Sequence, residues 1–220
     1  MLQKSTLDFL NKLAKNNHKE WFNKHRLLYE AAKKDMQQFT NDLIKEVAFF
    51  DNGISTLLAK DCIFRINRDV RFSKNKEPYK NNMGAYLAPG GKKSVFAGYY
   101  VHIEPSGESF LAGGIYAPEP ATLNKIRQEI DYNSEEFKKI ISSKSFIKTF
   151  GELAGERVKT APKGYDKKHP EIHLLKYKSY IVSHKIDKET ITDKNFVKYC
   201  GKVFKEMYPF NNFLNRAVSE

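Results

Sequence analysis

The sequence lacks the features that mark a membrane or secreted protein. No apolar run approaches the ~18 residues that a transmembrane helix needs. Residues 1–19 alternate charged side chains with Leu and Phe, without the apolar core and cleavage site of a secretory signal. The two cysteines, Cys62 and Cys200, lie far apart in the chain, which is typical of free thiols in a reducing compartment. We therefore expect a cytoplasmic protein with no membrane partner.

Sequence motifs for cofactors and activated nucleophiles are missing as well. The chain has no phosphate-binding Walker loop, no dinucleotide-binding fingerprint and no nucleophile elbow. His169 and His173 are four residues apart, but Pro170 separates them and no third ligand is near. The sequence therefore predicts neither a cofactor nor a metal. It also lacks repeats, low-complexity tracts and a linker, so we expect one domain over residues 1–220.

What the sequence does contain is a surplus of positive charge in two places. The chain has 38 basic and 26 acidic residues, for a net charge of +12, and its 40% apolar content is enough for a folded core. Residues 65–80 carry six basic and two acidic side chains, and residues 157–188 carry nine and three, so these stretches contribute +4 and +6. Such concentration favours an anionic ligand over a general role in solubility.

Hydrophobic periodicity predicts helices near both chain ends. A short helix follows Ser5, and a second of about thirty residues begins at the cap residue Asn17 and ends before Asn52. Helices also begin near Pro120 and Ser134. The last helix lies within residues 192–215 and is predicted to break at Pro209, because proline cannot donate a backbone hydrogen bond.

Alternating side chains predict strands in the middle of the chain. A strand is expected at 61–67, a loop at 75–91, a hairpin from 94–104 to 109–117, and a last strand at 177–185. If Glu104 pairs with Ser109, Tyr100 lies opposite Gly113. The fold class is α+β, with a central, mainly antiparallel sheet and helices at both chain ends. The segments of the domain are a helical part (5–50), a sheet-forming centre (61–117), a basic loop with the last strand (157–185) and a C-terminal helix (192–215).

The arginine-rich stretch is the densest candidate site. A bulge near Arg68 would turn Arg65, Arg68 and Arg71 outward together, where Asp69 could orient a guanidinium group. A guanidinium group suits phosphate or carboxylate because it donates two parallel hydrogen bonds. The alternative is a surface strand in which Asp69 and Glu77 neutralise the arginines through ion pairs.

Two further groups of residues have both a functional and a plain interpretation. Tyr100, His102 and Glu104 share one face of a strand, where an imidazole beside a carboxylate could transfer protons; otherwise they form an exposed polar face. The segment K-T-A-P-K-G-Y at 159–165, which runs on to His169, could bind an anion or could be a solvated basic loop.

Together these residues predict a site for a small anionic molecule, with or without catalysis. The anion would be held by Arg65, Arg68, Arg71, Lys76 and Lys80, the pocket walled by Tyr79 and Tyr100, and protons moved by His102, Glu104 and Asp69. Two alternatives are a nucleic-acid-binding module, given the basic and aromatic residues, and a protein-interaction scaffold.

The same motifs resemble a known family. The pattern R-x-x-R-D-x-R-F at 65–72, followed by K-x-P-Y-K at 76–80, is similar to the signature of the bacterial family called domain of unknown function 2461. N-H-K-E-W-F at 17–22, A-G-Y-Y-x-H-I-E-P at 97–105 and K-T-A-P-K-G-Y at 159–165 resemble other parts of that family. The resemblance spans nearly the whole chain and implies a single full-length domain, without implying an activity.

Overall fold

The computed structural model describes residues 1–219 and is built on one four-stranded antiparallel sheet. The strands lie in the order β1 (Met83–Leu87), β2 (Gly98–Ile103), β3 (Phe110–Ile115) and β4 (Tyr180–Lys185). Helices occupy both ends of the chain, so the predicted α+β class is confirmed. Within the described residues, no helix combines the length and the apolar character needed to cross a bilayer.

Helices precede the sheet, and the long helix predicted there is divided. The N-terminal elements are α1 (Lys4–Lys15), α2 (Lys19–Lys24), α3 (Arg26–Ala48), the 3-10 turn η1 (Asn52–Ile54) and α4 (Ala59–Cys62). The break falls at His25, whose imidazole hydrogen-bonds to the Trp21 carbonyl at 2.8 Å and stacks on the Trp21 ring. Such side-chain bonding to the backbone competes with regular helix. His18, rather than the predicted Asn17, caps α2.

The predicted strand at 61–67 and loop at 75–91 are both wrong in part. Residues 63–67 make only isolated bridges, Ile63 with Ala85 and Asn67 with Tyr79, while the supposed loop contains β1. The alternating pattern placed Phe64 on the same face as Cys62. Cys62 is buried, but Phe64 is 37% exposed. Strand β1 forms because β2 supplies its hydrogen-bonding partner, and that long-range pairing leaves little local trace in five residues.

The predicted hairpin is confirmed, with a register one residue away from the expected one. Tyr100 pairs with Ala112 and His102 with Phe110. The cause is Ser109, whose hydroxyl accepts a hydrogen bond from the Glu104 N–H and donates one to the Glu104 carbonyl, both at 2.9 Å. The side chain therefore takes the place of a backbone pair, and the ladder begins one residue later.

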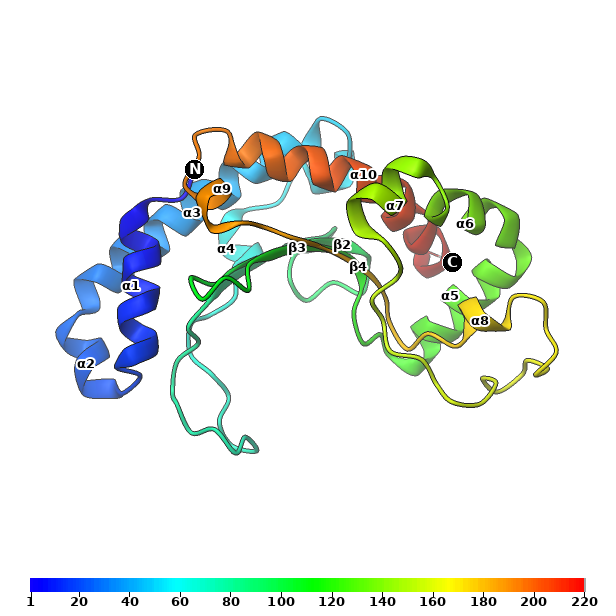
Figure 1. Cartoon of the computed structure of the whole chain (residues 1–220), viewed down its shortest axis with the longest axis horizontal. Coiled ribbons are helices and arrows are strands. Elements are labelled where there is room, and N and C mark those ends of the chain that lie inside the picture. The colour runs from blue at the N-terminus through cyan, green and yellow to red at the C-terminus, as the bar shows by residue number, and fades with distance from the viewer. Residues whose placement is uncertain (220) are drawn as a thin grey trace.

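Helices cover one face of the curved sheet and leave the other open (Figure 1). The elements after the hairpin are α5 (Pro120–Tyr132), α6 (Ser134–Ile141), α7 (Lys144–Phe150), α8 (Ile172–Leu175), α9 (Lys188–Ile191) and α10 (Phe196–Ser219). Helices α3 and α10 lie across the covered face. The loop of residues 67–78 hangs below one end of the open face, and α5, α8 and the basic loop lie at the other.

Helix α10 continues through Pro209, contrary to the predicted break. Proline inside a helix costs about 3 kcal/mol because it removes one hydrogen bond and crowds the preceding turn. Large buried side chains on both sides of this position, Phe204, Met207, Phe210 and Phe213, outweigh that cost. These residues belong to one hydrophobic cluster that also includes side chains of the sheet and of α1 and α3.

Candidate functional site

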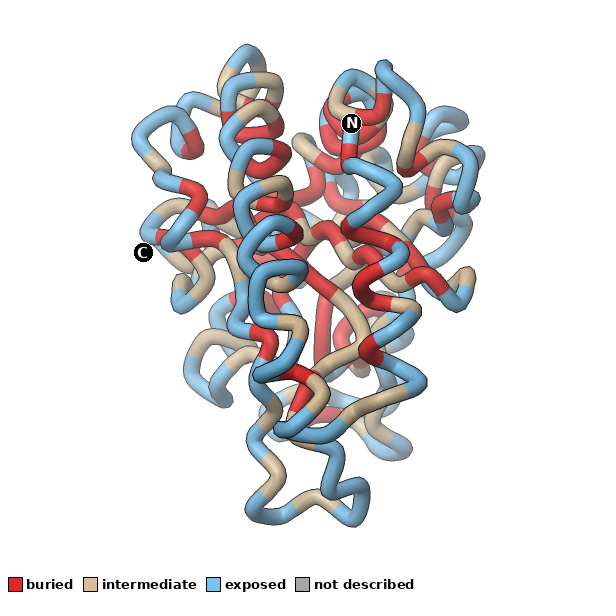
Figure 2. Tube along the Cα trace, turned by 90° about the vertical axis from the view of Figure 1, so that its left-hand side faces the viewer, coloured by how far each residue is buried: buried red, intermediate tan, exposed pale blue. Residues whose placement is uncertain are grey.

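The arginine-rich loop is fastened at its base and exposed along its length. Its base is closed by hydrogen bonds from the Arg68 N–H to the Pro78 carbonyl (2.9 Å) and from the Lys80 N–H to the Ile66 carbonyl (2.8 Å). None of residues 67–78 is buried, and the loop protrudes at the foot of Figure 2. The loop therefore meets solvent on most sides.

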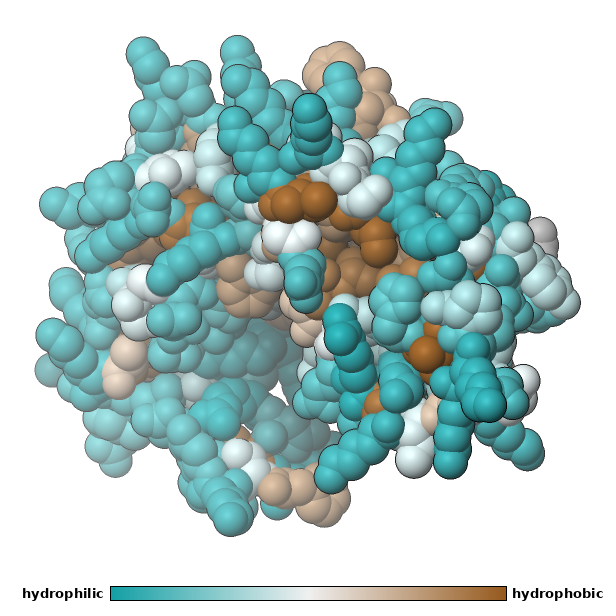
Figure 3. Space-filling view, turned by 45° about the vertical axis from the view of Figure 1, so that its right-hand side comes forward, coloured by the Kyte–Doolittle hydropathy of each residue, from teal (hydrophilic) through white to brown (hydrophobic). Residues whose placement is uncertain are grey.

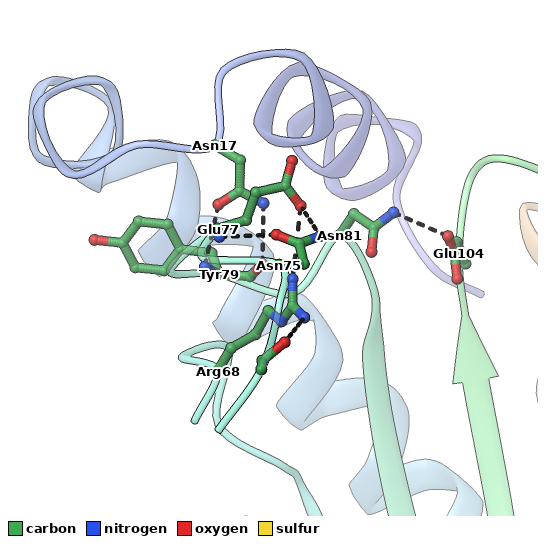
Figure 4. A network of polar contacts seen from close by, with 8 residues as sticks. Asn17, Arg68, Asn75, Glu77, Tyr79, Asn81 and Glu104 are labelled. Atoms are coloured by element: carbon green, nitrogen blue, oxygen red, sulfur yellow. Dashed lines mark hydrogen bonds and ion pairs between the residues drawn. The ribbon is translucent and has the colours of Figure 1, made fainter. Parts of the chain in front are cut away.

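Tyr79 fixes the loop to the N-terminal helices. The Asn17 side chain donates to the Tyr79 carbonyl at 2.9 Å and accepts from the Tyr79 N–H at 3.1 Å (Figure 4). The Tyr79 ring is buried and stacks on Phe22, with the ring centroids 4.0 Å apart. This tyrosine, predicted as a pocket wall, is placed as an anchor of the loop.

Several cations of the predicted anion clamp are already engaged inside the loop. Arg71 donates to both carboxylate oxygens of Asp69, at 2.9 and 2.6 Å, which lowers the pKa of Asp69 and raises that of Arg71. Arg68 lies 3.6 Å from a carboxylate oxygen of Glu77. Lys76 donates to a backbone carbonyl, at 3.1 Å. For Arg68 and Arg71, this geometry corresponds to the ion-paired alternative.

Arg65 and Lys80 differ from Arg68, Arg71 and Lys76 because their cationic groups make neither an ion pair nor a hydrogen bond within residues 1–219. The Lys80 ammonium group lies 5.5 Å from the centre of the Phe64 ring. Burial lowers the pKa of Lys80, and the positive charge of nearby Arg65 lowers it further. A bound anion would offset both effects, because its negative charge stabilises the protonated ammonium group.

A groove lies under the open face of the sheet, next to Lys80. Its volume is about 680 Å³, within the usual range for small-molecule sites. Tyr100 from β2 and Phe110, Ala112 and Gly114 from β3 form its floor, and small side chains on β3 leave it hollow. Figure 3 shows the hollow between the two sides of the molecule, with hydrophilic side chains around it.

The rim of this groove carries charge from distant parts of the chain. Lys80 and Lys92 contribute positive charge, and Glu119 contributes the negative charge. Phe64 forms a side wall and packs edge-on against Tyr100, with ring centroids 6.0 Å apart. The groove is thus mostly apolar with a few charged groups at its edge, which is the usual composition of a small-molecule site.

A chain of hydrogen bonds leads from the groove along the outer face of β2. The Tyr100 hydroxyl lies 3.0 Å from His102 Nδ1, and His102 Nε2 lies 3.1 Å from Glu104 Oε2. Asn81 donates to the other Glu104 oxygen at 3.0 Å, and Phe110 stacks on the imidazole at 4.8 Å. Only Tyr100 of the first three lines the groove; His102 and Glu104 stand behind it.

The direction of these hydrogen bonds follows from the chemistry of the groups. An ionised Glu104 carboxylate only accepts, so His102 Nε2 carries the proton in that bond. A neutral imidazole then has its lone pair on Nδ1, which accepts the hydrogen of the Tyr100 hydroxyl. Burial raises the pKa of Tyr100, which keeps the hydroxyl neutral. Tyr86 also lines the groove, but its hydroxyl lies within hydrogen-bond distance of the Phe96 and Gly114 carbonyls, at 2.8 and 3.1 Å.

Gly84 leaves room for the Tyr100 ring, and no motif in the sequence indicates this role. A Cβ atom at this position of β1 would lie 2.7 Å from the Tyr100 hydroxyl oxygen and 3.0 Å from a ring carbon. The absent side chain therefore leaves space for the ring close to Gly84, and from there the hydroxyl reaches His102. Sequence reasoning also missed Lys92 and Phe64, because nothing in their local sequence indicates that tertiary packing brings them to one groove.

The basic loop at 157–169 does not join this groove, although Ile181, further along the second basic stretch, lines it. Arg157 lies over the Tyr177 ring at 4.5 Å and hydrogen-bonds to its hydroxyl. His169 pairs with Asp131 at 2.9 Å. No residue of 157–169 lines the groove. Within residues 1–219 no three His, Cys, Asp or Glu side chains are grouped so that they could hold a metal ion.

Fold and site together define an α+β protein whose antiparallel sheet is covered on one face and presents a groove with a tyrosine–histidine–glutamate chain on the other. The chain belongs to the family described as conserved hypothetical protein DUF2461, whose family model matches residues 5–213. The expected family membership is confirmed. Searches of curated proteins and of solved structures found no match.

Proposed function

We propose that the protein binds a small anionic molecule in the groove under the sheet and exchanges a proton with it through Tyr100. The observation that carries this proposal is the continuous chain from the Tyr100 hydroxyl through His102 to Glu104, with distances of 3.0 and 3.1 Å. Such a chain positions one hydroxyl at the groove and connects it to a group that can take up its proton.

The shape and charge of the groove indicate the kind of ligand. Lys80 and Lys92 attract one or two negative charges at the rim, which suits a carboxylate or a single phosphate group. Phe64 and Phe110 offer ring surfaces to an apolar part of the ligand. The proposed ligand is therefore a carboxylate or monophosphate with an apolar body, in place of the arginine-bound anion that the sequence alone predicts.

The hydrogen-bond directions assign roles in a proton transfer. The Tyr100 oxygen has lone pairs left to accept a proton from the ligand while its own proton passes to His102 Nδ1. The resulting imidazolium lies 3.1 Å from the Glu104 carboxylate, which stabilises its charge. The reverse movement returns the proton to the ligand. Tyr100 is thus the group that contacts the ligand, and His102 and Glu104 act through it.

The proposal is tested by a thermal-shift screen of carboxylates and monophosphates with apolar bodies, followed by measurement of Kd. We expect Lys80→Gln to weaken binding at least about fivefold, since it removes a charge–charge contact. Lys148→Gln, an exposed lysine outside the groove, is the matched control and should leave Kd unchanged. The proton transfer is followed as deuterium incorporation from heavy water into the bound molecule.

Tyr100→Phe should slow that incorporation at least about 100-fold while changing Kd little, because general acid–base groups contribute on this scale. Tyr132→Phe, an exposed tyrosine outside the groove, is its control. The proposal fails if no compound binds, or if Lys80→Gln has no effect. Binding without Tyr100-dependent exchange would remove the proton transfer. Oligonucleotide binding that falls about a thousandfold between 50 and 200 mM salt would favour the nucleic-acid alternative.

A further inference from the structure

A second cavity lies on the other side of Phe64 and is lined by positive charge. Its volume is about 620 Å³, and it lies between α3, α4, residues 63–66 and the turn at 92–93. The cations that line it are Lys33, Lys60, Arg65, Lys92 and Lys93, and no acidic side chain lines it. Only Arg65 belongs to the arginine-rich motif, so the cluster is assembled by the fold.

The turn that carries Lys92 and Lys93 is locked onto α4. The Lys92 N–H donates to the Asp61 carbonyl, and the Lys92 ammonium group donates to the Lys60 carbonyl, both at 2.9 Å. Gly91 has φ +82°, and a Cβ atom there would lie 2.9 Å from the Asp61 carbonyl oxygen. Only a residue without a side chain fits this close approach in that conformation. These contacts hold Lys60, Lys92 and Lys93 close to one another.

The positive charges of this cavity are poorly compensated by the protein itself. Lys33 lies 3.9 Å from a carboxylate oxygen of Glu30, which also pairs with Arg26. The other four cations make no ion pair within the part of the chain that the structure describes. Like charges that line one cavity repel one another, and a bound anion offsets that repulsion. Four to five cations call for several negative charges, more than one carboxylate provides.

The floor of the cavity is apolar. Met36, Ile66 and Met83 are buried there, and Tyr29 and Phe64 form its aromatic edges. A purely inorganic anion would leave the partly exposed rings of Tyr29 and Phe64 open to water, whereas a ligand with an organic body would cover them. We infer that this cavity binds an organic polyphosphate, with the phosphates on the lysines and the organic body on the apolar floor. The inference does not depend on the proposed function, although the cavity and the groove share Lys92 and Phe64.

Calorimetric titration of the full chain with ATP, tripolyphosphate and adenosine tests the inference. ATP should bind most tightly, tripolyphosphate more weakly and adenosine least. In Lys60→Glu/Lys93→Glu, Kd for ATP should rise at least about tenfold, because two attractions become repulsions. Neither substitution touches the neighbouring groove, which has Lys92 and Phe64 in common with the cavity.

The matched control is Lys148→Glu/Lys202→Glu, which changes the net charge equally at exposed positions outside both cavities. Its Kd should equal that of the unaltered protein. Equal weakening in the two double variants would reduce the site to non-specific charge and overturn the inference. So would the absence of saturable binding of ATP and tripolyphosphate. Tripolyphosphate binding as tightly as ATP would exclude the organic body from the site.

Discussion

Two neighbouring tyrosines show how differently the two faces of the sheet are used. Tyr99 points into the covered face, is fully buried, and donates its hydroxyl proton to Asp51 at 2.9 Å. Tyr100 points to the open face, and its hydroxyl leads through His102 to Glu104. The covered face uses its residues for stability, whereas the open face holds a polar chain beside a groove. One strand supplies both tyrosines, because successive side chains of a strand point to opposite faces of the sheet.

The largest expected effect contrasts adjacent residues of β3. Leu111 lies on the covered face with 0% exposure, so Leu111→Ala should lower the free energy of unfolding by about 2–5 kcal/mol. Phe110 is only partly buried on the open face, and Phe110→Ala should cost about 1 kcal/mol. Urea denaturation measures both. Equal losses would mean that the open face contributes to the core as much as the covered face.

A smaller effect on stability should accompany loss of the tyrosine–histidine contact. In Gly84→Ala the new Cβ displaces the Tyr100 ring from its present place, 2.7 Å away at the hydroxyl. We expect a stability loss of about 1–2 kcal/mol, since a side-chain end has to move. The diagnostic readout is the ¹⁵N spectrum of His102, whose Nδ1 signal should change.

Two further variants serve as the positive and the negative control for Gly84→Ala. Tyr100→Phe should change the His102 Nδ1 signal in the same way, because it removes the hydroxyl directly. Ala112→Gly alters a floor residue that makes no hydrogen bond to His102, and should leave the signal as it is. An unchanged spectrum in Gly84→Ala would show that the ring adapts and that Gly84 does not position it.

The smallest expected effect is a difference in alkaline stability between the two tyrosines. Burial raises the pKa of both Tyr99 and Tyr100 above that of an unfolded tyrosine, near 10. Their contribution is therefore complete below pH ~10 and is lost as pH rises further, and the loss is larger for the tyrosine whose pKa is raised more. Tyr99→Phe should reduce the loss between pH 8 and pH 11 more than Tyr100→Phe, because nearby Asp51 also raises the pKa of Tyr99.

Urea denaturation at the two pH values measures this difference. Tyr132→Phe, at an exposed position, should show the same loss as the unaltered protein. The loss itself includes the titration of lysines, which cancels when variants are compared at the same pH. If Tyr100→Phe reduced the loss as much as Tyr99→Phe, the hydroxyl on the open face would be as costly to ionise as the buried one.

The arginine-rich stretch shows that cations close together in the sequence need not form a cluster of unpaired positive charge in the folded protein. Arg68 and Arg71 are close in sequence to Glu77 and Asp69, and a protruding loop lets each pair with its neighbour. Lys60 and Lys93 are distant in sequence, yet both line the cavity beside Arg65. The local sequence therefore drew attention to Arg68 and Arg71, whose charges are neutralised by acidic residues close to them in the chain.

The sequence by itself determined the features that depend on local periodicity and turn chemistry. Alternation of side chains correctly placed Tyr100, His102 and Glu104 together on one face of the strand. Terminal helices and the hairpin followed from the same patterns, because burying one side of an element requires a matching period in the chain. These features require no knowledge of distant residues.

Only the tertiary structure decided strand β1, the register of the hairpin and both cavities. Five residues of β1 become a strand because β2 completes their hydrogen bonds, and Gly84 matters because Tyr100 lies over it. The continuation of α10 through Pro209 depends on packing that outweighs a local penalty. In each case the deciding energy comes from contacts between residues far apart in the chain, and a local pattern does not record them.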